Sequence, residues 1–418
     1  MTFQKPKGTQ DFYPEDKALQ NKIFNILRSV AQKYNFQEIE SPAFENIEVL
    51  TKKEGEEITS QIFTLEKRGE EKFGLRFDLT VPAARMFIAK QKEIPKPVKW
   101  FYLSRMWRYE QPQTGRLREF YQLSAEIFGS DRPEADAEAI SLLIDCFLAL
   151  GLTSNDFLVK INNRKLLQGI VAELVPQGNI NKVITLIDKK DKISEQDFIA
   201  SLKDQGVDEA KAAQLMKMLN ITDLAKLKDL NKEAEEGKKE LQAILELLKA
   251  RKEFIQVNLS TARGLAYYTG TVFEVADRQG KFRALAGGGR YDQMIESFGG
   301  DPCPATGFGL GYATLLLILQ EKKLMPAVDA RPDFYIAAVT ENEQEKALEI
   351  ASQLRKKYVV EIDLMGKKIG KQLKYANQIS AKKAIIIGEK EAKERKAKIK
   401  DMDSGEEKEV SFEELSMI

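Results

Sequence analysis

The chain has 418 residues, enough for two or three domains with buried cores. Its 65 basic and 64 acidic side chains nearly cancel, so any contact with nucleic acid must come from a local patch. The sequence contains no apolar run long enough to span a bilayer, and its first residues lack the apolar core of a signal peptide. We therefore expect a cytoplasmic globular protein.

Histidine is absent from the sequence. Nucleophilic schemes that pair serine or cysteine with histidine are therefore excluded, as are histidine ligands for zinc. The two cysteines, Cys146 and Cys303, lie far apart without a metal-binding or redox spacing, and we interpret both as packing residues. Any catalysis must depend on carboxylates, arginines, tyrosines, backbone amides or a bound metal.

The first predicted element is an amphipathic helix over residues 16–34, followed by a short strand over 37–40 that ends at Ser41-Pro42. Apolar residues recur in the helix at helical spacing: Leu19, Ile23, Ile26, Leu27 and Val30. An apolar strand around 73–77 then runs into Asp78-Leu79-Thr80 and a helix with a proline in its first turn. Either Asp78 or Thr80 could cap that helix.

Two strands joined by a polar loop are predicted over residues 101–110 and 117–128. The loop contains Pro112 and Gly115, which favour a turn. Because alternate side chains of a strand share a face, one surface should collect several polar and aromatic groups: Phe120, Gln122, Ser124 and Glu126, beside Arg108 and Glu110. Such a surface suits a phosphate and a planar heterocycle, although a salt-bridged sheet surface is an alternative.

Helical composition rich in Lys, Glu, Leu and Ala follows over residues 166–251, without evident site chemistry. The sheet then resumes with the run Arg263-Gly264-Leu265-Ala266-Tyr267-Tyr268-Thr269-Gly270 and with Gly-Gly-Gly-Arg-Tyr-Asp at 287–292. Three glycines after a strand permit close approach of the backbone to a ligand, or form a tight turn. The run Thr-Gly-Phe-Gly-Leu-Gly at 306–311 precedes a helix over 312–319. We reject a dinucleotide site there, because no βαβ unit with a ribose-binding acid follows.

A small α/β domain is predicted after a linker at 326–332, because strands and helices alternate from residue 333 to residue 387. Residues 366–400 contain 12 Lys or Arg against 3 Glu. This excess is either a solvated face or a surface for a nucleic-acid backbone.

These motifs together resemble class II aminoacyl-tRNA synthetases. The hairpin resembles motif 2, the first helix, strand and proline resemble motif 1, and residues 306–319 resemble motif 3. The pair Gln122 and Glu126, with the runs at 263–270 and 287–292, resembles histidyl-tRNA synthetases in particular. The resemblance implies an α+β fold with an antiparallel catalytic sheet, a helical insertion and a C-terminal α/β anticodon-binding domain. The implied divisions are 1–165 and 252–325 for the catalytic domain, 166–251 for the insertion and 331–418 for the anticodon-binding domain.

The resemblance also implies an activity, namely a histidine–tRNA ligase that activates histidine with ATP and transfers it to the tRNA for histidine. The arginines at 108 and 263 would be catalytic, on opposite sides of the ATP α-phosphate. The ATP site would contain Arg108, Glu110, Arg116, Phe120 and Arg263. The histidine site would contain Asp78, Thr80, Arg108, Gln122, Glu126, Arg263, Tyr267, Tyr268, Gly287 and Gly288. Mg²⁺ would assist, through ligands that the sequence leaves open, and two copies of the chain would form a homodimer away from any membrane.

The sequence departs from the family pattern at two places. Ala266 stands where the family usually has Asp, and Ala313-Thr314 stands where it has Glu-Arg, whose arginine holds the ATP γ-phosphate. These departures favour an alternative, a non-catalytic histidine-sensing paralogue such as the regulatory subunit of ATP phosphoribosyltransferase. The basic C-terminal domain argues against it. A tRNA-binding regulator with a decayed active site is a third possibility. The absence of histidine fits biased residue usage, or an enzyme that avoids needing histidine for its own synthesis.

Overall fold

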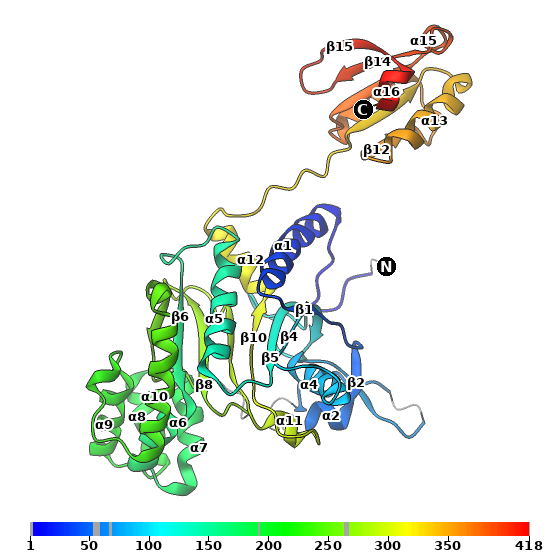
Figure 1. Cartoon of the computed structure of the whole chain (residues 1–418). Helices are drawn as coiled ribbons and strands as arrows, with labels where there is room; N and C mark the ends of the chain where they lie inside the picture. Colours follow the sequence, from blue (N-terminus) through cyan, green and yellow to red (C-terminus); the bar gives the residue numbers. More distant parts are fainter. Residues whose placement is uncertain (1–2, 53–58, 67–68, 191–192, 263–266, 418) are drawn as a thin grey trace. The chain divides into compact units, whose positions relative to one another are not determined.

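The computed structural model of the chain describes residues 3–52, 59–66, 69–190, 193–262 and 267–417 (Figure 1). The chain divides into two compact units, Met1–Pro326 and Ala327–Ile418. The first unit is built on a large sheet with the strand order β1-β4-β5-β10-β9-β8-β6-β7. Its strands are β1 (Gln37–Glu38), β4 (Val98–Trp107), β5 (Glu119–Phe128), β6 (Phe157–Asn163), β7 (Ile255–Val257), β8 (Thr271–Asp277), β9 (Ala286–Arg290) and β10 (Ala305–Gly311).

The central strands of this sheet pair in antiparallel fashion, from β4 through β5, β10, β9 and β8 to β6. Parallel pairs occur at the two edges, where β1 joins β4 and β7 joins β6. Antiparallel sheets accept helices on their faces without crossover connections between each pair of strands. The predicted α+β class and antiparallel sheet are thus confirmed.

Alternation along β5 separates a core face from a second face. Leu123, Ala125 and Ile127 belong to a large core that also contains buried residues of α1 (Pro14–Lys33), α5 (Pro133–Leu148) and α12 (Tyr312–Glu321). On the other face, the even-numbered residues of β5 lie on the side of a second core, which includes residues of α4 (Thr80–Lys90) and α11 (Met294–Ser297). The period of two in the sequence therefore predicted correctly which side chains share a surface.

The strands of the hairpin are displaced from their predicted limits. The strand β4 begins at Val98 and ends at Trp107, and β5 begins at Glu119. Trp107 and Glu119 lie opposite each other in the antiparallel register. The backbone N–H groups of Arg118 and Glu119 both donate to the carbonyl oxygen of Gly8, at 2.8 and 3.2 Å. This N-terminal segment takes the hydrogen bonds that would extend β5, so the connection is longer than the sequence predicted.

The first helix, α1, matches its predicted limits within two residues. Pro14 occupies its first turn, where a missing N–H costs nothing, and Asn35 with a φ of 57° follows its end. Its apolar face, including Ile23 and Leu27, is buried in the core shared with α5. A short antiparallel pair, β2 (Phe44–Asn46) and β3 (Phe73–Leu75), with α2 (Ile47–Thr51), lies between α1 and α4 in the chain.

A group of helices is inserted between β6 and β7, and Figure 1 shows it beside β6, away from β1. Its members are α6 (Arg164–Leu174), α7 (Ile180–Lys189), α8 (Glu195–Asp204), α9 (Glu209–Leu219) and α10 (Lys232–Leu247), with 3-10 turns η1 (Gln177–Asn179), η3 (Leu224–Lys226) and η4 (Lys249–Phe254). The helices α6 and α10 pack closely, because a Cβ on Gly169 would lie 2.6 Å from the backbone nitrogen of Ala234. Gly237 similarly faces the backbone of Leu166, so both glycines permit close contact between the two helices.

The second unit contains a mixed sheet with the strand order β12-β11-β13-β14-β15. Its strands are β11 (Phe334–Ala338), β12 (Val360–Ile362), β13 (Lys383–Ile387), β14 (Lys396–Asp401) and β15 (Glu407–Ser411), and its helices are η5 (Glu341–Glu343), α13 (Gln344–Leu354), α14 (Ile369–Gln378), α15 (Glu389–Lys393) and α16 (Phe412–Met417). The strands β12, β11 and β13 are parallel, as the alternation predicted. The antiparallel β14 and β15 were not predicted, because the alternation of lysine with Ala397 and Ile399 was interpreted only as a basic run.

Within the described ranges, no helix combines the length and apolar character needed to cross a membrane.

Candidate active site

The carboxyl group of Glu126 is buried on the second face of the large sheet. Glu126 is 1% exposed, and its Oε1 accepts a hydrogen bond of 2.9 Å from the hydroxyl of Thr80. Its Oε2 accepts a hydrogen bond from the hydroxyl of Tyr291. Burial raises the pKa of Glu126 to about 8, and the nearby carboxylate of Asp78 acts in the same direction, whereas both hydroxyl donors oppose the shift. A buried carboxyl that two donors orient is suited to recognising a ligand N–H.

Glycines form the floor beside this carboxyl group. In the antiparallel register Gly307 of β10 lies opposite Glu126, and Gly289 of β9 lies opposite Gly307. A Cβ on Gly307 would overlap Oε2 of Glu126, and a Cβ on Gly309 would overlap the amide of Gln122. The sheet can hold these two polar side chains flat on its surface only because the next strand has no side chains there.

The sequence suggested that the three consecutive glycines at 287–289 follow a strand or form a tight turn. Both expectations are wrong. The glycines lie inside β9, which pairs with β10 on one side and β8 on the other. Gly287 lies opposite Gly309 and shares the face of Glu126, whereas Gly288 lies opposite Phe308 on the core face. The structure therefore brings Gly287, but not Gly288, to the surface that carries Glu126.

The start of α4 lies against the same carboxyl group. Oδ1 of Asp78 accepts hydrogen bonds from the backbone N–H groups of Thr80 (2.6 Å) and Val81 (3.3 Å), so Asp78 caps the helix. This is one of the two capping alternatives that the sequence left open. The hydroxyl of Thr80 is directed instead to Glu126. Both predicted residues are thus at the site, and both have structural bonds.

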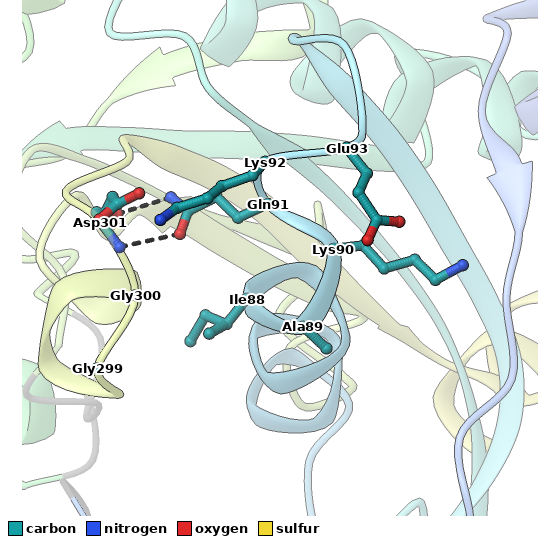
Figure 2. A pocket seen from close by; sticks show the side chains of 9 residues that line it. All are labelled: Ile88, Ala89, Lys90, Gln91, Lys92, Glu93, Gly299, Gly300 and Asp301. Carbon is teal, nitrogen blue, oxygen red and sulfur yellow. Dashed lines mark hydrogen bonds between the residues drawn. The ribbon is translucent and has the colours of Figure 1, made fainter.

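The far end of α4 is tied to the loop after α11. The side-chain amide of Gln91 donates to the carbonyl oxygen of Asp301 (2.7 Å) and accepts from its N–H (2.9 Å), as Figure 2 shows. These two residues border a pocket of about 300 Å³ that residues 88–93 and 299–301 line. The pocket contains none of the predicted site residues. The two hydrogen bonds of Gln91 tie the C-terminal end of α4, the helix that begins at Thr80, to this loop.

Three tyrosines enclose the site. The ring centroids of Tyr267 and Tyr268 are 4.8 Å apart, and those of Tyr267 and Tyr291 are 5.7 Å apart in an edge-to-face arrangement. The Tyr268 ring lies against Gly289, where a Cβ would be 2.9 Å from it. Arg263 and Ala266, predicted in the same run, lie outside the described residues.

The sequence prediction missed Tyr291, although it quoted the Gly-Gly-Gly-Arg-Tyr-Asp run. Arg290, the preceding residue, is 6% exposed and contacts Asp136 through two hydrogen bonds of 2.9 and 2.6 Å. The other oxygen of Asp136 accepts from Thr306 at 2.8 Å. This buried ion pair faces the sheet interior rather than the ligand site, so Arg290 anchors the segment and Tyr291 reaches the site. The only signal in the sequence was a tyrosine hydroxyl within the Gly-Gly-Gly-Arg-Tyr-Asp run.

The other end of the site is formed by the connection between β4 and β5. Nε of Arg108 donates to the carbonyl oxygen of Phe77 at 3.0 Å, and its guanidinium carbon lies 5.5 Å from the ring centroid of Phe120. The carboxylate of Glu110 forms an ion pair with Arg116, and Gln122 donates to Ser124 at 2.7 Å. The predicted group of Arg108, Glu110, Phe120 and Gln122 is therefore assembled along one surface.

Thr314 lies where the connection meets α12. Its hydroxyl donates to the carbonyl oxygen of Gly311 at 3.1 Å, and its methyl group lies 3.1 Å from where a Cβ of Gly115 would be. Gly115 has a φ of 74°, a left-handed conformation that favours glycine. The short threonine side chain leaves room for this turn to pack on the first turn of α12.

The architecture, an antiparallel sheet that presents a buried carboxylate and Arg108 on one face and is joined to an α/β unit, is that of a class II aminoacyl-tRNA synthetase. The crystal structure of histidyl-tRNA synthetase from Nostoc sp. PCC 7120 superimposes with a TM-score of 0.81 at 26% identity, covering 100% of this chain and 99% of that chain.

Sequence comparison narrows the class to one family. A family model described as histidyl-tRNA synthetase matches residues 8–315, and a model of an anticodon-binding domain matches residues 333–418. A histidine–tRNA ligase of Pyrococcus furiosus is 38% identical over 99% of this chain and 97% of its own length, and one of Haloarcula marismortui is 39% identical over 96% and 94%. The chain belongs to the histidyl-tRNA synthetase family, which confirms the predicted resemblance.

Proposed function

We propose that the chain is a histidine–tRNA ligase whose amino-acid pocket is the enclosure around Glu126. The supporting observation is the buried carboxyl group, held by Thr80 and Tyr291 over a floor of glycines. The curated relatives with this activity match nearly the full length of the chain. The enzyme would act in the cytoplasm.

Histidine would bind with its imidazole N–H on Glu126, and Tyr267 and Tyr268 would form a wall of the pocket. Its ammonium group would meet Asp78 and the oxygen of Thr80, because a fixed carboxylate and hydroxyl suit an ammonium. Its carboxylate would lie near Gln122 and Arg108, toward the loop end of the surface, and Gly287 belongs to the pocket floor. A pocket of this kind selects a side chain by leaving its own buried acceptor unpaired when the wrong amino acid enters.

ATP would lie at the loop end, with its adenine on Phe120 beside Glu110. Arg108 and Arg263 would hold the α-phosphate, and Arg116 would reach the pyrophosphate end. The histidine carboxylate oxygen attacks the α-phosphorus and the bond to the bridging oxygen breaks, giving histidyl-adenylate and pyrophosphate. A terminal ribose hydroxyl of tRNA then attacks the histidyl carbonyl carbon and AMP leaves. Both steps depend on positioning and on positive charge placed where charge develops.

Mg²⁺ would enter with the phosphates of ATP and neutralise part of their charge. Within the described ranges no group of three or more acidic or cysteine side chains is arranged to hold a metal ion. Magnesium usually binds one or two carboxylates together with substrate phosphates and water, so a full protein cage is not required. Glu274 of β8 lies opposite Gly287 on the site face and could supply such a carboxylate.

The second unit would bind the anticodon arm of the histidine tRNA. Its lysine excess at 366–400 includes Lys368 and Lys371 at the start of α14. Neutralising phosphates with lysines makes binding fall steeply with salt. Deleting residues from about 331 onward should therefore weaken tRNA binding and flatten its salt dependence, while histidine activation persists.

We also propose the domain limits. The catalytic domain would contain 1–165 and 252–325, the helical insertion 166–251, and the anticodon-binding domain 331–418.

A homodimer is the proposed assembly, with α1 and the strand that ends near Pro42 in the contact. The apolar face of α1 is used by its own core, so the contact would involve the opposite face of the helix and the exposed edge strand β1. A C2 contact would be isologous. Sedimentation at micromolar concentration measures it, and a monomer would contradict it.

The regulatory paralogue is not favoured. The anticodon-binding domain is present at 333–418, and histidine–tRNA ligases match over nearly the full length. The deciding experiment is histidine-dependent exchange of pyrophosphate into ATP in the presence of Mg²⁺. We expect exchange that depends on both substrates. Background exchange at millimolar ATP and histidine would overturn the proposal.

A further inference from the structure

Tyr291 and Thr80 hold the two oxygens of one carboxyl group from opposite sides. The Tyr291 hydroxyl donates to Oε2 of Glu126, and the Thr80 hydroxyl donates to Oε1 at 2.9 Å. The carboxyl group cannot rotate about its last bond without losing at least one of these hydrogen bonds. A carboxylate has about four acceptor positions, so the two hydroxyls leave acceptor capacity for a ligand while fixing its direction.

The position of the Tyr291 hydroxyl is itself fixed by its neighbours. The residue is 2% exposed, and its backbone N–H donates to the carbonyl oxygen of Ala305 at 2.8 Å. Its ring packs edge-to-face on Tyr267, and the preceding Arg290 is anchored to Asp136. The hydroxyl is therefore delivered to Glu126 by packing, a backbone bond and an ion pair.

The strand β10, next to Glu126, leaves room for the hydrogen bond between Tyr291 and Glu126 because it has a glycine at position 307. A Cβ on Gly307 would overlap Oε2, the oxygen that Tyr291 contacts. A side chain there would push the carboxyl group out of reach of the tyrosine.

We propose that Tyr291 is a specificity-determining positioning residue, whose hydroxyl, with that of Thr80, fixes the carboxyl of Glu126 toward the imidazole N–H of histidine. The inference rests on the proposed function. Tyr291 acts through Glu126 and need not touch the reacting atoms.

A pH profile separates this role from simple packing. Among the described residues, the ionisable groups that act on Glu126 include Asp78 before α4, Tyr102 on β4 and Tyr291, and Tyr268 acts on Tyr291. The Tyr291 hydroxyl lowers the pKa of Glu126, so its removal lets the pKa rise above about 8. Free imidazole is neutral above about pH 6.5, and in the proposed complex it binds protonated Glu126 as an imidazolium–carboxylate pair that keeps this proton. Above the pKa of Glu126 the same pair requires proton uptake, so histidine affinity falls. Loss of the proton from the α-ammonium group of histidine also weakens binding at alkaline pH, but equally for every variant.

The test is Tyr291→Phe in the full-length chain, with histidine binding followed by calorimetry from pH 6 to 10 and the Michaelis constants taken from pyrophosphate exchange. We expect histidine affinity to fall about tenfold or more, the size of one hydrogen bond to a charged group. The ATP constant should stay unchanged, and the alkaline limb of histidine binding should move to higher pH. The matched control is Tyr335→Phe in the second unit, whose buried hydroxyl has no hydrogen-bond partner among the described residues.

Two outcomes would overturn the proposal. Histidine affinity within twofold of the unmodified protein would do so, as would equal changes in the histidine and ATP constants without a shift of the alkaline limb. Thr80→Val removes the other donor and should move the limb in the same direction, which tests the geometry if Tyr291→Phe does not fold. An unmodified protein without histidine-dependent exchange would instead refute the proposed function.

Discussion

The two ends of the surface along β5 are built differently. At the histidine end, Glu126 accepts hydrogen bonds from Thr80 and Tyr291, which belong to separate segments of the chain. Its position beside glycines of β10 and β9 is set by the register in which β5, β10 and β9 pair. At the ATP end, Glu110 and Arg116 hold each other within one connection between strands, and the Arg116 side chain is 31% exposed. In the proposed function, selectivity for the amino acid would thus depend on the sheet, whereas ATP contacts would depend on local side-chain pairs. The histidine end should therefore be the more sensitive to single substitutions.

The largest expected effect concerns the free energy of unfolding, which the burial of Glu126 at the histidine end should lower at alkaline pH. The pKa of Glu126 is raised from 4.5 to about 8 in the folded chain, so the folded state keeps a proton that the unfolded state loses between these values. Stability should therefore fall as pH rises from about 4.5 to 8 and level off above. Glu126→Gln has no carboxyl group to titrate, so its free energy of unfolding should not fall in this way. At about 1.4 kcal/mol per pKa unit, its stability relative to the unmodified chain should increase by up to roughly 4 kcal/mol between pH 5 and pH 8.

Denaturant unfolding at pH 5 and pH 8 measures this difference. The unmodified chain is the reference, and its stability should fall relative to that of Glu126→Gln between the two pH values. Parallel changes in the two chains would contradict a raised pKa at Glu126.

Gly307→Ala should lower histidine activation about a hundredfold or more, since displacing a binding group by about 1 Å has that effect. The added Cβ would overlap Oε2 of Glu126. Gly311→Ala, on the same strand, is the control, because its Cβ would lie 3.3 Å from the Thr314 hydroxyl and requires little adjustment. Pyrophosphate exchange measures both. A similar loss in the two variants would indicate that the strand, rather than the pocket, is disturbed.

Glu126→Ala should weaken histidine binding by roughly 1.5–3 kcal/mol, the range for a charge-assisted hydrogen bond. Calorimetry with histidine measures the loss, and ATP binding should change far less. Equal histidine affinity before and after the substitution would show that the pocket is assigned to the wrong place.

Arg116→Ala should raise the Michaelis constant for ATP by about fivefold or less, because partly exposed ion contacts contribute little. The histidine constant should stay the same. If the histidine constant rose as much as that for ATP, the two ends would not be separable.

The smallest effect is expected from Thr314→Arg, which restores the usual family residue. The rate should stay nearly unchanged, or the Michaelis constant for ATP should fall, because the added charge would serve the γ-phosphate rather than the α-phosphate. Steady-state kinetics measures this. A large loss of rate would show that the longer side chain displaces the turn at Gly115 from α12.

Local patterns predicted much of this molecule. The helical spacing of Leu19 to Val30 predicted α1, and the alternation along β5 placed Gln122 and Glu126 on one face. These signals are local, because side-chain direction repeats every 3.6 residues in a helix and every two in a strand. The succession of motifs was also sufficient to indicate the family, which the comparisons confirmed.

The tertiary structure decided what those residues contact. Tyr291 and Glu126 are 165 residues apart, and Asp136 and Arg290 are 154 apart, so no periodicity relates them. The register of β5, β10 and β9 turns Gly307 into a pocket floor, while shifting it by one residue would place it on the core face. The sequence by itself determined which groups the chain could offer to a ligand. Only the pairing of distant strands determined which of them meet, because that pairing depends on the packing of the whole sheet.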